Sequence, residues 1–233
     1  MKIRKILNYF TATEWILWLS SMILVFVSFL LSPEKDALSV ISSIIGVTAL
    51  IFSAKGNPFG QILMIIFCIM YGVISYIFAY YGEVLTYVFM TGPMAVVALI
   101  SWLKNPYEGN KAEVKVNQIS KTEVVIMFSL SVIVTLLFYF VLKAFGTANL
   151  LLSTLSITTS FLAVYLTARR NPFYALAYAA NDVVLVALWT LASFTNPEYI
   201  STIACFAVFL ANDIYGFISW RRMEKRQMQG TKD

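Results

Sequence analysis

The chain contains no histidine, only two cysteines, and few charged residues, which make up 12% of its 233 positions. Without histidine, the side chain that most often serves as a general base or a metal ligand is missing. There is also no HExxH segment, no Cys-x-x-Cys pair and no phosphate-binding glycine loop, the motifs of zinc enzymes, metal or redox sites, and nucleotide-binding proteins. We therefore expect no enzyme activity, no catalytic residues, no metal and no cofactor.

Hydrophobic residues, in contrast, make up 60% of the chain, and the mean hydropathy is +0.78. A helix needs about 20 mainly apolar residues to cross a hydrocarbon core about 30 Å thick. Eight such runs occur, at roughly 15–31, 38–54, 59–81, 84–103, 124–142, 149–168, 173–194 and 199–220. Because these runs are continuous and do not alternate as barrel strands do, the sequence predicts an all-α polytopic membrane protein with eight transmembrane helices.

Lysine and arginine are distributed unevenly among the loops. With eight crossings, 15 of the 17 basic residues fall on the side of the two termini, and only Lys35 and Lys143 fall on the other. The positive-inside rule then predicts cytoplasmic termini and a multi-pass protein of the cell (inner) membrane, in contact with the lipid bilayer. The net charge of +5 is explained by topology and implies no nucleic-acid partner. The basic tail reads as a solvated flank of the last helix.

The tripeptide Asn-Pro-Phe occurs twice, starting at Asn57 and at Asn171, 114 positions apart. The same offset matches further residues upstream: Leu38 with Leu152, Ser42 with Ser156, Ala49 with Ala163 and Ala54 with Ala168. After a four-residue slip, Ser101-Trp102 falls on Ser219-Trp220. Asparagine caps helices and proline suits the first helical position, so the tripeptide should start the third and seventh helices. The chain therefore contains an internal duplication.

The duplication predicts the architecture. Helices two to four match helices six to eight, an even number of crossings apart, so two parallel three-helix repeats enter the membrane in the same direction. The predicted divisions are 1–37 (a helix outside the repeat), 38–104 (repeat one), 105–151 (cytoplasmic loop and linker helix), 152–222 (repeat two) and 223–233 (basic tail). The similar segments TATEW and SKTEV before helices one and five hint at a common origin. Parallel repeats are a transporter plan, with substrate bound near the midplane between them.

Asp182 and Asp213 lie inside predicted transmembrane helices, where charged residues are rare, costly and usually functional. At helical spacing, aromatic and amide side chains share their helix faces, and a few polar or aromatic residues of repeat one complete the predicted substrate-binding set: Gln61, Tyr71, Tyr174, Tyr178, Asn181, Asp182, Trp189, Phe209, Asn212 and Asp213. Aromatic faces stack on a flat ring or attract a cationic one, and amides bond to hydroxyls. For the two asparagines, bonding between helices is the alternative. Gly92-Pro93 is predicted to kink the fourth helix and act as a hinge.

Three stretches are similar to one known family: YGEVLTYVFMTGPMAVVALISW (Tyr81 to Trp102), AYAANDVVLVALW (Ala177 to Trp189) and FLANDIYGFISWRRMEKR (Phe209 to Arg226). They resemble the PnuC family of nicotinamide riboside transporters. The fold relatives of that family are the SWEET sugar transporters. The resemblance implies a 3+1+3 helix plan and uptake of a small vitamin precursor by facilitated diffusion, followed by trapping through a cytoplasmic kinase. The ligand stays open between nicotinamide riboside and another vitamin or nucleoside, such as thiamine. Proton coupling through Asp182 and Asp213 and assembly into a homo-oligomer also stay open.

Overall fold

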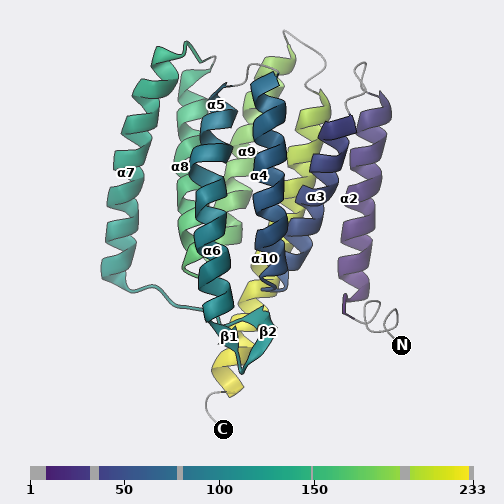
Figure 1. Cartoon of the computed structure of the whole chain (residues 1–233), viewed down its shortest axis with the longest axis vertical. Helices are drawn as coiled ribbons and strands as arrows, with labels where there is room; N and C mark the ends of the chain where they lie inside the picture. Colours follow the sequence, from purple (N-terminus) through teal and green to yellow (C-terminus); the bar gives the residue numbers. More distant parts are fainter. Residues whose placement is uncertain (1–8, 32–36, 78–80, 148, 195–199, 231–233) are drawn as a thin grey trace.

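The computed structural model of the chain describes residues 9–31, 37–77, 81–147, 149–194 and 200–230 (Figure 1). Its long helical segments are α2 (Ala12–Leu31), α3 (Ala37–Ala54), α4 (Phe59–Ile77), the continuous run α5 (Tyr81–Val84), η1 (Leu85–Thr91) and α6 (Gly92–Lys104), α7 (Lys121–Ala144), α8 (Leu150–Ala168), α9 (Phe173–Ser193) and α10 (Ile200–Gly230). Within the described residues, eight helices are long and apolar enough to cross a membrane. The predicted all-α polytopic fold is confirmed.

Both Asn-Pro-Phe segments start a helix, as predicted. The side-chain oxygen of Asn57 accepts the backbone N–H of Phe59 at 2.9 Å, and that of Asn171 accepts the N–H of Phe173 at 3.1 Å. The residue before each asparagine has a left-handed backbone, with φ of 65° at Gly56 and 58° at Arg170. Such a turn ends one helix and caps the next. Although one copy has glycine and the other arginine at this point, the duplicated turns have the same geometry.

The helices pack with the symmetry that the duplication predicts. Within each unit the helices follow one another side by side, α3 on α4 on α6 and α8 on α9 on α10. Between the units, the first helix of one contacts the last helix of the other, so that α3 packs on α10 and α6 on α8 (Figure 1). These two helix–helix interfaces, α3 with α10 and α6 with α8, lie on either side of the space between the units. The exact division of the chain into repeats stays a prediction.

The two helices outside these units, α2 and α7, are fixed in the same way. Glu14 near the start of α2 forms an ion pair with Lys55 at 3.0 Å, and Glu123 near the start of α7 pairs with Arg169. Lys55 and Arg169 are themselves related by the 114-residue offset. The equivalent contacts support the common origin that the TATEW and SKTEV segments hint at.

The tail differs from the prediction. The last helix does not end at Trp220 but continues to Gly230, and a hairpin of β1 (Pro106–Tyr107) and β2 (Asn110–Val114) lies against it, in the stretch predicted to be only a loop (Figure 1). The Gln227 side chain accepts the Val116 N–H at 2.8 Å and donates to the Val114 carbonyl at 3.1 Å. The basic residues Arg222, Lys225 and Arg226 are exposed, as a solvated flank requires, but the hairpin buries the opposite face of the tail, including Met223 and Gln227.

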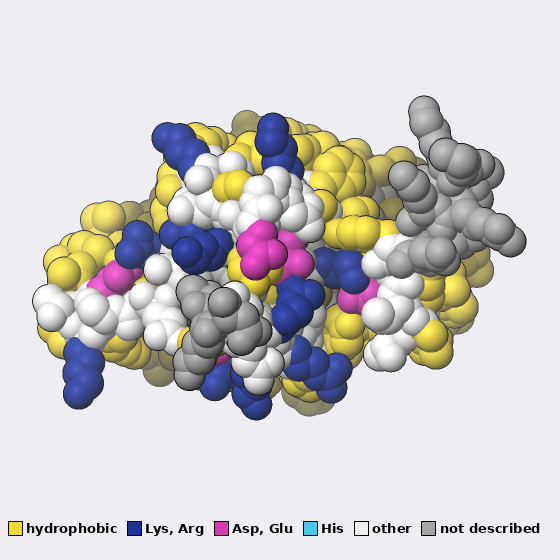
Figure 2. Space-filling model, turned by 90° about the horizontal axis from the view of Figure 1, so that it is seen from below, with side chains coloured by type: hydrophobic (Ala, Val, Ile, Leu, Met, Phe, Trp, Pro, Cys, Tyr) yellow, Lys and Arg dark blue, Asp and Glu magenta, His cyan; other side chains and the backbone are white. Residues whose placement is uncertain are grey.

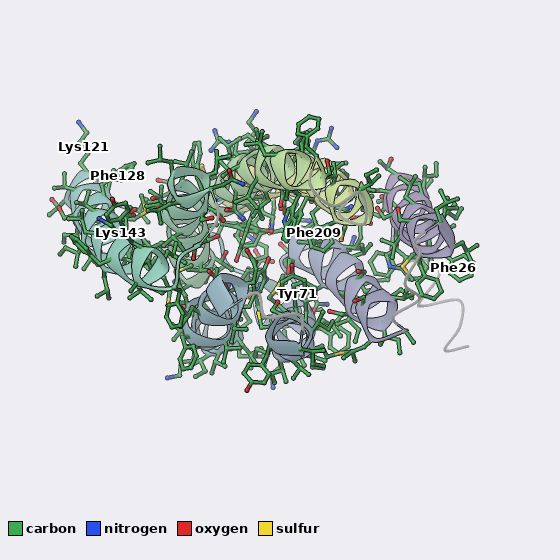
Figure 3. The ribbon with its side chains drawn as sticks, turned by 90° about the horizontal axis from the view of Figure 1, so that it is seen from above. Phe26, Tyr71, Lys121, Phe128, Lys143 and Phe209 are labelled. Atoms are coloured by element: carbon green, nitrogen blue, oxygen red, sulfur yellow. The ribbon has the colours of Figure 1, made fainter. Side chains whose placement is uncertain are left out.

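We call the end of the bundle that carries β1 and β2 the hairpin end. The first described helix, α2, begins at this end, and the last, α10, ends there (Figure 1). Seen from below, lysine and arginine side chains gather on it (Figure 2). Lys143, at the last turn of α7, lies at the opposite end (Figures 1 and 3); Lys35, the other basic residue predicted there, lies outside the described residues. This arrangement is the one the charge count predicts, and the assignment of the hairpin end to the cytoplasm stays a prediction.

Candidate functional site

Two carboxyl groups lie in the interior of the bundle, halfway along their helices. Asp182 of α9 is 3% exposed and Asp213 of α10 is 5% exposed. Their side chains are close enough to interact electrostatically. One carboxyl oxygen of Asp182, Oδ2, has no hydrogen-bond partner among the described residues. A buried polar atom without a partner is costly, so this oxygen is available to a ligand group or a water.

An aromatic cluster with residues from both units lies near the acid pair, since Tyr87 is close enough to interact electrostatically with Asp182. Tyr71 of α4 stacks on Phe67, with ring centroids 5.5 Å apart, and meets the Tyr87 ring of η1 edge to face at 4.6 Å. Phe209 of α10 contacts Phe67 at 6.1 Å, and Trp189 of α9 belongs to the same buried cluster. Tyr71 and Phe209 both lie toward the interior of the bundle (Figure 3). The structure thus brings together three predicted residues from both units, Tyr71, Trp189 and Phe209.

The predicted break at Gly92-Pro93 takes an unexpected form. The chain stays helical but forms the π-helix η1, and the Gly92 N–H bonds back to the Tyr87 carbonyl five residues earlier. A Cβ atom at Gly92 would lie only 2.9 Å from that carbonyl oxygen, so the turn depends on glycine. Single π-helical turns often mark functional sites. The π-helix carries Tyr87 against Tyr71, and a hinge role for Gly92 and Pro93 stays a prediction.

Tyr174 and Tyr178 belong to a second cluster, nearer the hairpin end. The Tyr174 ring lies 5.0 Å from the ring of Trp220 and 6.3 Å from that of Tyr178. The phenol group of Tyr178 is close enough to interact electrostatically with both acids. The predicted binding residues of α9 therefore divide between two clusters, Trp189 in one and Tyr174 and Tyr178 in the other, with Asp182 between them along the helix.

The predicted amides are engaged in helix packing. The Asn181 side-chain oxygen accepts hydroxyl hydrogen bonds from three residues of α8: Ser156 at 3.1 Å, Thr159 at 2.8 Å and Ser160 at 3.1 Å. The Asn212 amide donates to Ser21 of α2 at 2.9 Å, and the Gln61 amide to Ser53 of α3 at 3.3 Å. These bonds are the interhelical ones that we named as the alternative for the two asparagines. Ligand roles for the three amides stay predictions.

We call the acid pair and the aromatic cluster together the centre. Sequence reasoning missed several of its residues. Phe67 and Cys68 are buried there, and they align with Asn181 and Asp182 through the 114-residue offset, so the duplication could have found them. Tyr87 had only the nearby Gly-Pro pair as a signal. Gly46 of α3 makes room for the cluster, because a Cβ atom there would lie 3.1 Å from the rings of both Phe67 and Phe209.

Metal sites, disulfides and cavities are the other features of the described residues that bear on function. No group of three or more acidic, cysteine or histidine residues in the described ranges is placed to hold a metal ion, and Cys68 and Cys205 are free thiols. A cavity of about 90 Å³ lies between α2 and α3, with apolar walls. Its lining includes Trp15, Trp18 and Phe52 and none of the predicted binding residues.

Comparisons with known proteins agree with this arrangement. A sequence model of the family described as "Nicotinamide mononucleotide transporter" matches residues 36–222. A Neisseria mucosa protein described as "Nicotinamide riboside transporter PnuC" is 26% identical over 224 residues, which cover 94% of this chain and 83% of the relative. A solved structure described as "Crystal structure of the Vitamin B3 transporter PnuC" has a TM-score of 0.80 at 24% identity, covering 94% of both chains. At that identity, the structural likeness shows the fold.

Proposed function

Because this chain belongs to the nicotinamide mononucleotide transporter family, and is thus a membrane transporter and not an enzyme, we propose that it takes up nicotinamide riboside or a closely similar vitamin nucleoside. The observation that carries the proposal is the buried pair Asp182 and Asp213, with one free carboxyl oxygen, next to an aromatic cluster. The relative from Neisseria mucosa is described as a transporter of nicotinamide riboside, which supports the same substrate class.

Nicotinamide riboside combines a flat cationic ring with a sugar, and the centre has a group suited to each part. Aromatic faces such as those of Tyr71, Tyr87 and Trp189 attract a cationic ring and stack on it. A carboxylate balances the positive charge and accepts hydrogen bonds from ribose hydroxyls, and bonds to charged groups are about twice as strong as neutral ones. The free Oδ2 of Asp182 is the acceptor that we assign to the substrate.

We further propose that the two three-helix units rock about this centre, opening it to each side of the membrane in turn, with the hairpin end in the cytoplasm. Transport should be passive, because the sequence has no ATP-binding motif. Net uptake then requires a cytoplasmic kinase that phosphorylates the nucleoside and traps it. The inner membrane of the cell is the proposed location, since α2 begins and α10 ends at the basic end.

The test is uptake of radiolabelled nicotinamide riboside by the purified protein in proteoliposomes. We expect the internal concentration to reach the external one and not to exceed it, with or without an imposed proton gradient. Accumulation driven by the gradient would replace passive transport by proton coupling through the two acids. Unlabelled thiamine serves as a competitor, and stronger inhibition by thiamine than by nicotinamide riboside would reassign the substrate.

A further inference from the structure

Trp102 and Trp220, which the duplication relates to each other, exchange hydrogen bonds between the two units. The Trp102 indole N–H donates to the Thr167 carbonyl at 2.8 Å, and the Trp220 indole N–H donates to the Ser53 carbonyl at 2.8 Å. Ser53 and Thr167 differ by the same 114 positions that separate the Asn-Pro-Phe copies. In each unit, the last helix therefore donates a hydrogen bond to the last turn of the first helix of the other unit.

This contact is buried and compact. Both tryptophan side chains are fully buried, and their ring centroids lie 5.3 Å apart. Each acceptor carbonyl also accepts a backbone N–H from the turn that follows it, from Gly56 at 2.9 Å and from Arg170 at 3.0 Å. Since a carbonyl has two lone pairs, the indole N–H takes the second acceptor position of each of these two carbonyls.

The tryptophan pair lies between the acid pair and the hairpin end. Toward the centre, Trp220 contacts Tyr174 at 5.0 Å, Tyr174 contacts Tyr178 at 6.3 Å, and Tyr178 interacts with both acids. Toward the hairpin, the same buried cluster includes Val114 of β2. A solute that leaves the centre between the units toward the hairpin end must pass the position of these two rings.

We propose that Trp102 and Trp220 are the gate at the hairpin end, closed in this structure, and that solute passage on this side requires both indole–carbonyl bonds to break. The inference rests on the proposed transport function, which needs the centre to open to each side in turn. Among the described residues, the two indole–carbonyl bonds are the side-chain hydrogen bonds that join α3 or α6 to α8 or α10 at this end, so the gate is held weakly enough to open reversibly. Trp102 and Trp220 are positioning residues and do not bind the solute.

The hairpin connection follows both halves of the gate. The Val114 N–H donates to the Gly56 carbonyl at 2.9 Å, and the Asn117 N–H donates to the Arg170 carbonyl at 3.0 Å. One stretch of chain thus bonds to the turn that follows each acceptor carbonyl of the gate. Separation of the units at this end has to stretch or release one of these two backbone bonds, which links the hairpin to gate opening.

The test uses Cys68 as a natural reporter in the centre, where it is 1% exposed. In a Cys205→Ser background, we expect Trp102→Phe and Trp220→Phe, which remove the indole N–H and keep a ring, to raise the rate at which a charged methanethiosulfonate reagent labels Cys68 from the hairpin side. A tenfold rise corresponds to about 1.4 kcal/mol, near the net value of one hydrogen bond. The symmetry predicts rises of similar size for the two variants. Labelling from the opposite side should fall or stay unchanged.

Trp18→Phe is the matched control. Trp18 also donates an indole hydrogen bond, to Thr48 at 3.1 Å, but this bond joins α2 to α3 and does not cross between the units. We expect it to leave Cys68 labelling unchanged. Unchanged labelling in both gate variants, or an equal rise from both sides, would overturn the gate. Because the labelling needs no substrate, it is independent of the proposed function, which fails instead if nicotinamide riboside is neither bound nor transported by the parent.

Discussion

Replacing Asp182 by asparagine should show whether its carboxylate binds the substrate or only supports the fold. The substitution keeps the shape of the side chain and removes the charge next to Asp213. A hydrogen bond to a charged group contributes about 1.5–3 kcal/mol, so losing the substrate bond to the free Oδ2 should weaken nicotinamide riboside binding roughly 10- to 150-fold. Folding should not suffer, since Oδ2 has no described protein partner to lose and one of two adjacent buried acids is neutralised.

The assay is isothermal titration of nicotinamide riboside into the purified protein, paired with a thermal unfolding scan. Glu14→Gln is the matched control, since Glu14 is also a buried acid, 3% exposed, but pairs with Lys55 at 3.0 Å away from the centre. The glutamine keeps an acceptor oxygen for Lys55 but removes its counter-charge, which should cost about 1–3 kcal/mol of stability, or roughly 2–12 °C in a chain of this size. Its affinity for the nucleoside should match that of the parent. Parent-like affinity in Asp182→Asn would refute the central site.

The remaining predictions concern the fold around this centre. Gly92→Ala should lower the transport rate and the thermal midpoint together, because its Cβ would meet the Tyr87 carbonyl at 2.9 Å, whereas Gly109→Ala, with no heavy atom nearby but a φ of 77°, should affect only the local turn. A cysteine at Lys111 should react with an impermeant thiol reagent only in inside-out vesicles, and one at Lys143 only in intact cells; the reverse pattern would invert the proposed topology. Gln227→Ala, which removes the bonds to Val114 and Val116, should cost about 1–3 kcal/mol and speed proteolysis of the tail; equal cleavage rates would show that the tail is held by other contacts.

The parts of the fold that local physics decides could be predicted from the sequence. The length of each apolar run located the membrane helices, and the caps at Asn57 and Asn171 follow from side-chain chemistry two residues away. The tail helix could not be predicted in the same way, because Met223 and Gln227 are buried by a hairpin about 110 positions earlier in the chain. The sequence alone shows the apolar and amide residues but not the surface that covers them.

In the centre, too, some residues could be predicted from local chemistry, and others depend on how the helices pack. The acids were identified because a buried charge is costly wherever it lies in a membrane. The amides were harder to place, since whether Asn181 faces a solute or the hydroxyls of α8 depends on the rotation of one helix against another. Tyr87 required knowledge of the π-helix, which shifts the helical register by one residue and which no periodicity rule anticipates.

The reciprocal bonds of Trp102 and Trp220 have a consequence for the history of the chain. A single ancestral unit with an Asn-Pro-Phe turn and a closing Ser-Trp could have satisfied both bonds by pairing with an identical copy around a twofold axis. Such a dimer would have had to carry every central residue twice, including each acid. Fusion of two copies into one gene removes that requirement, and in this chain Phe67 and Cys68 now stand where the second half has Asn181 and Asp182. The hairpin end of the molecule has kept the twofold arrangement of these bonds, while the centre has been free to lose it, as the proposed asymmetric solute would require.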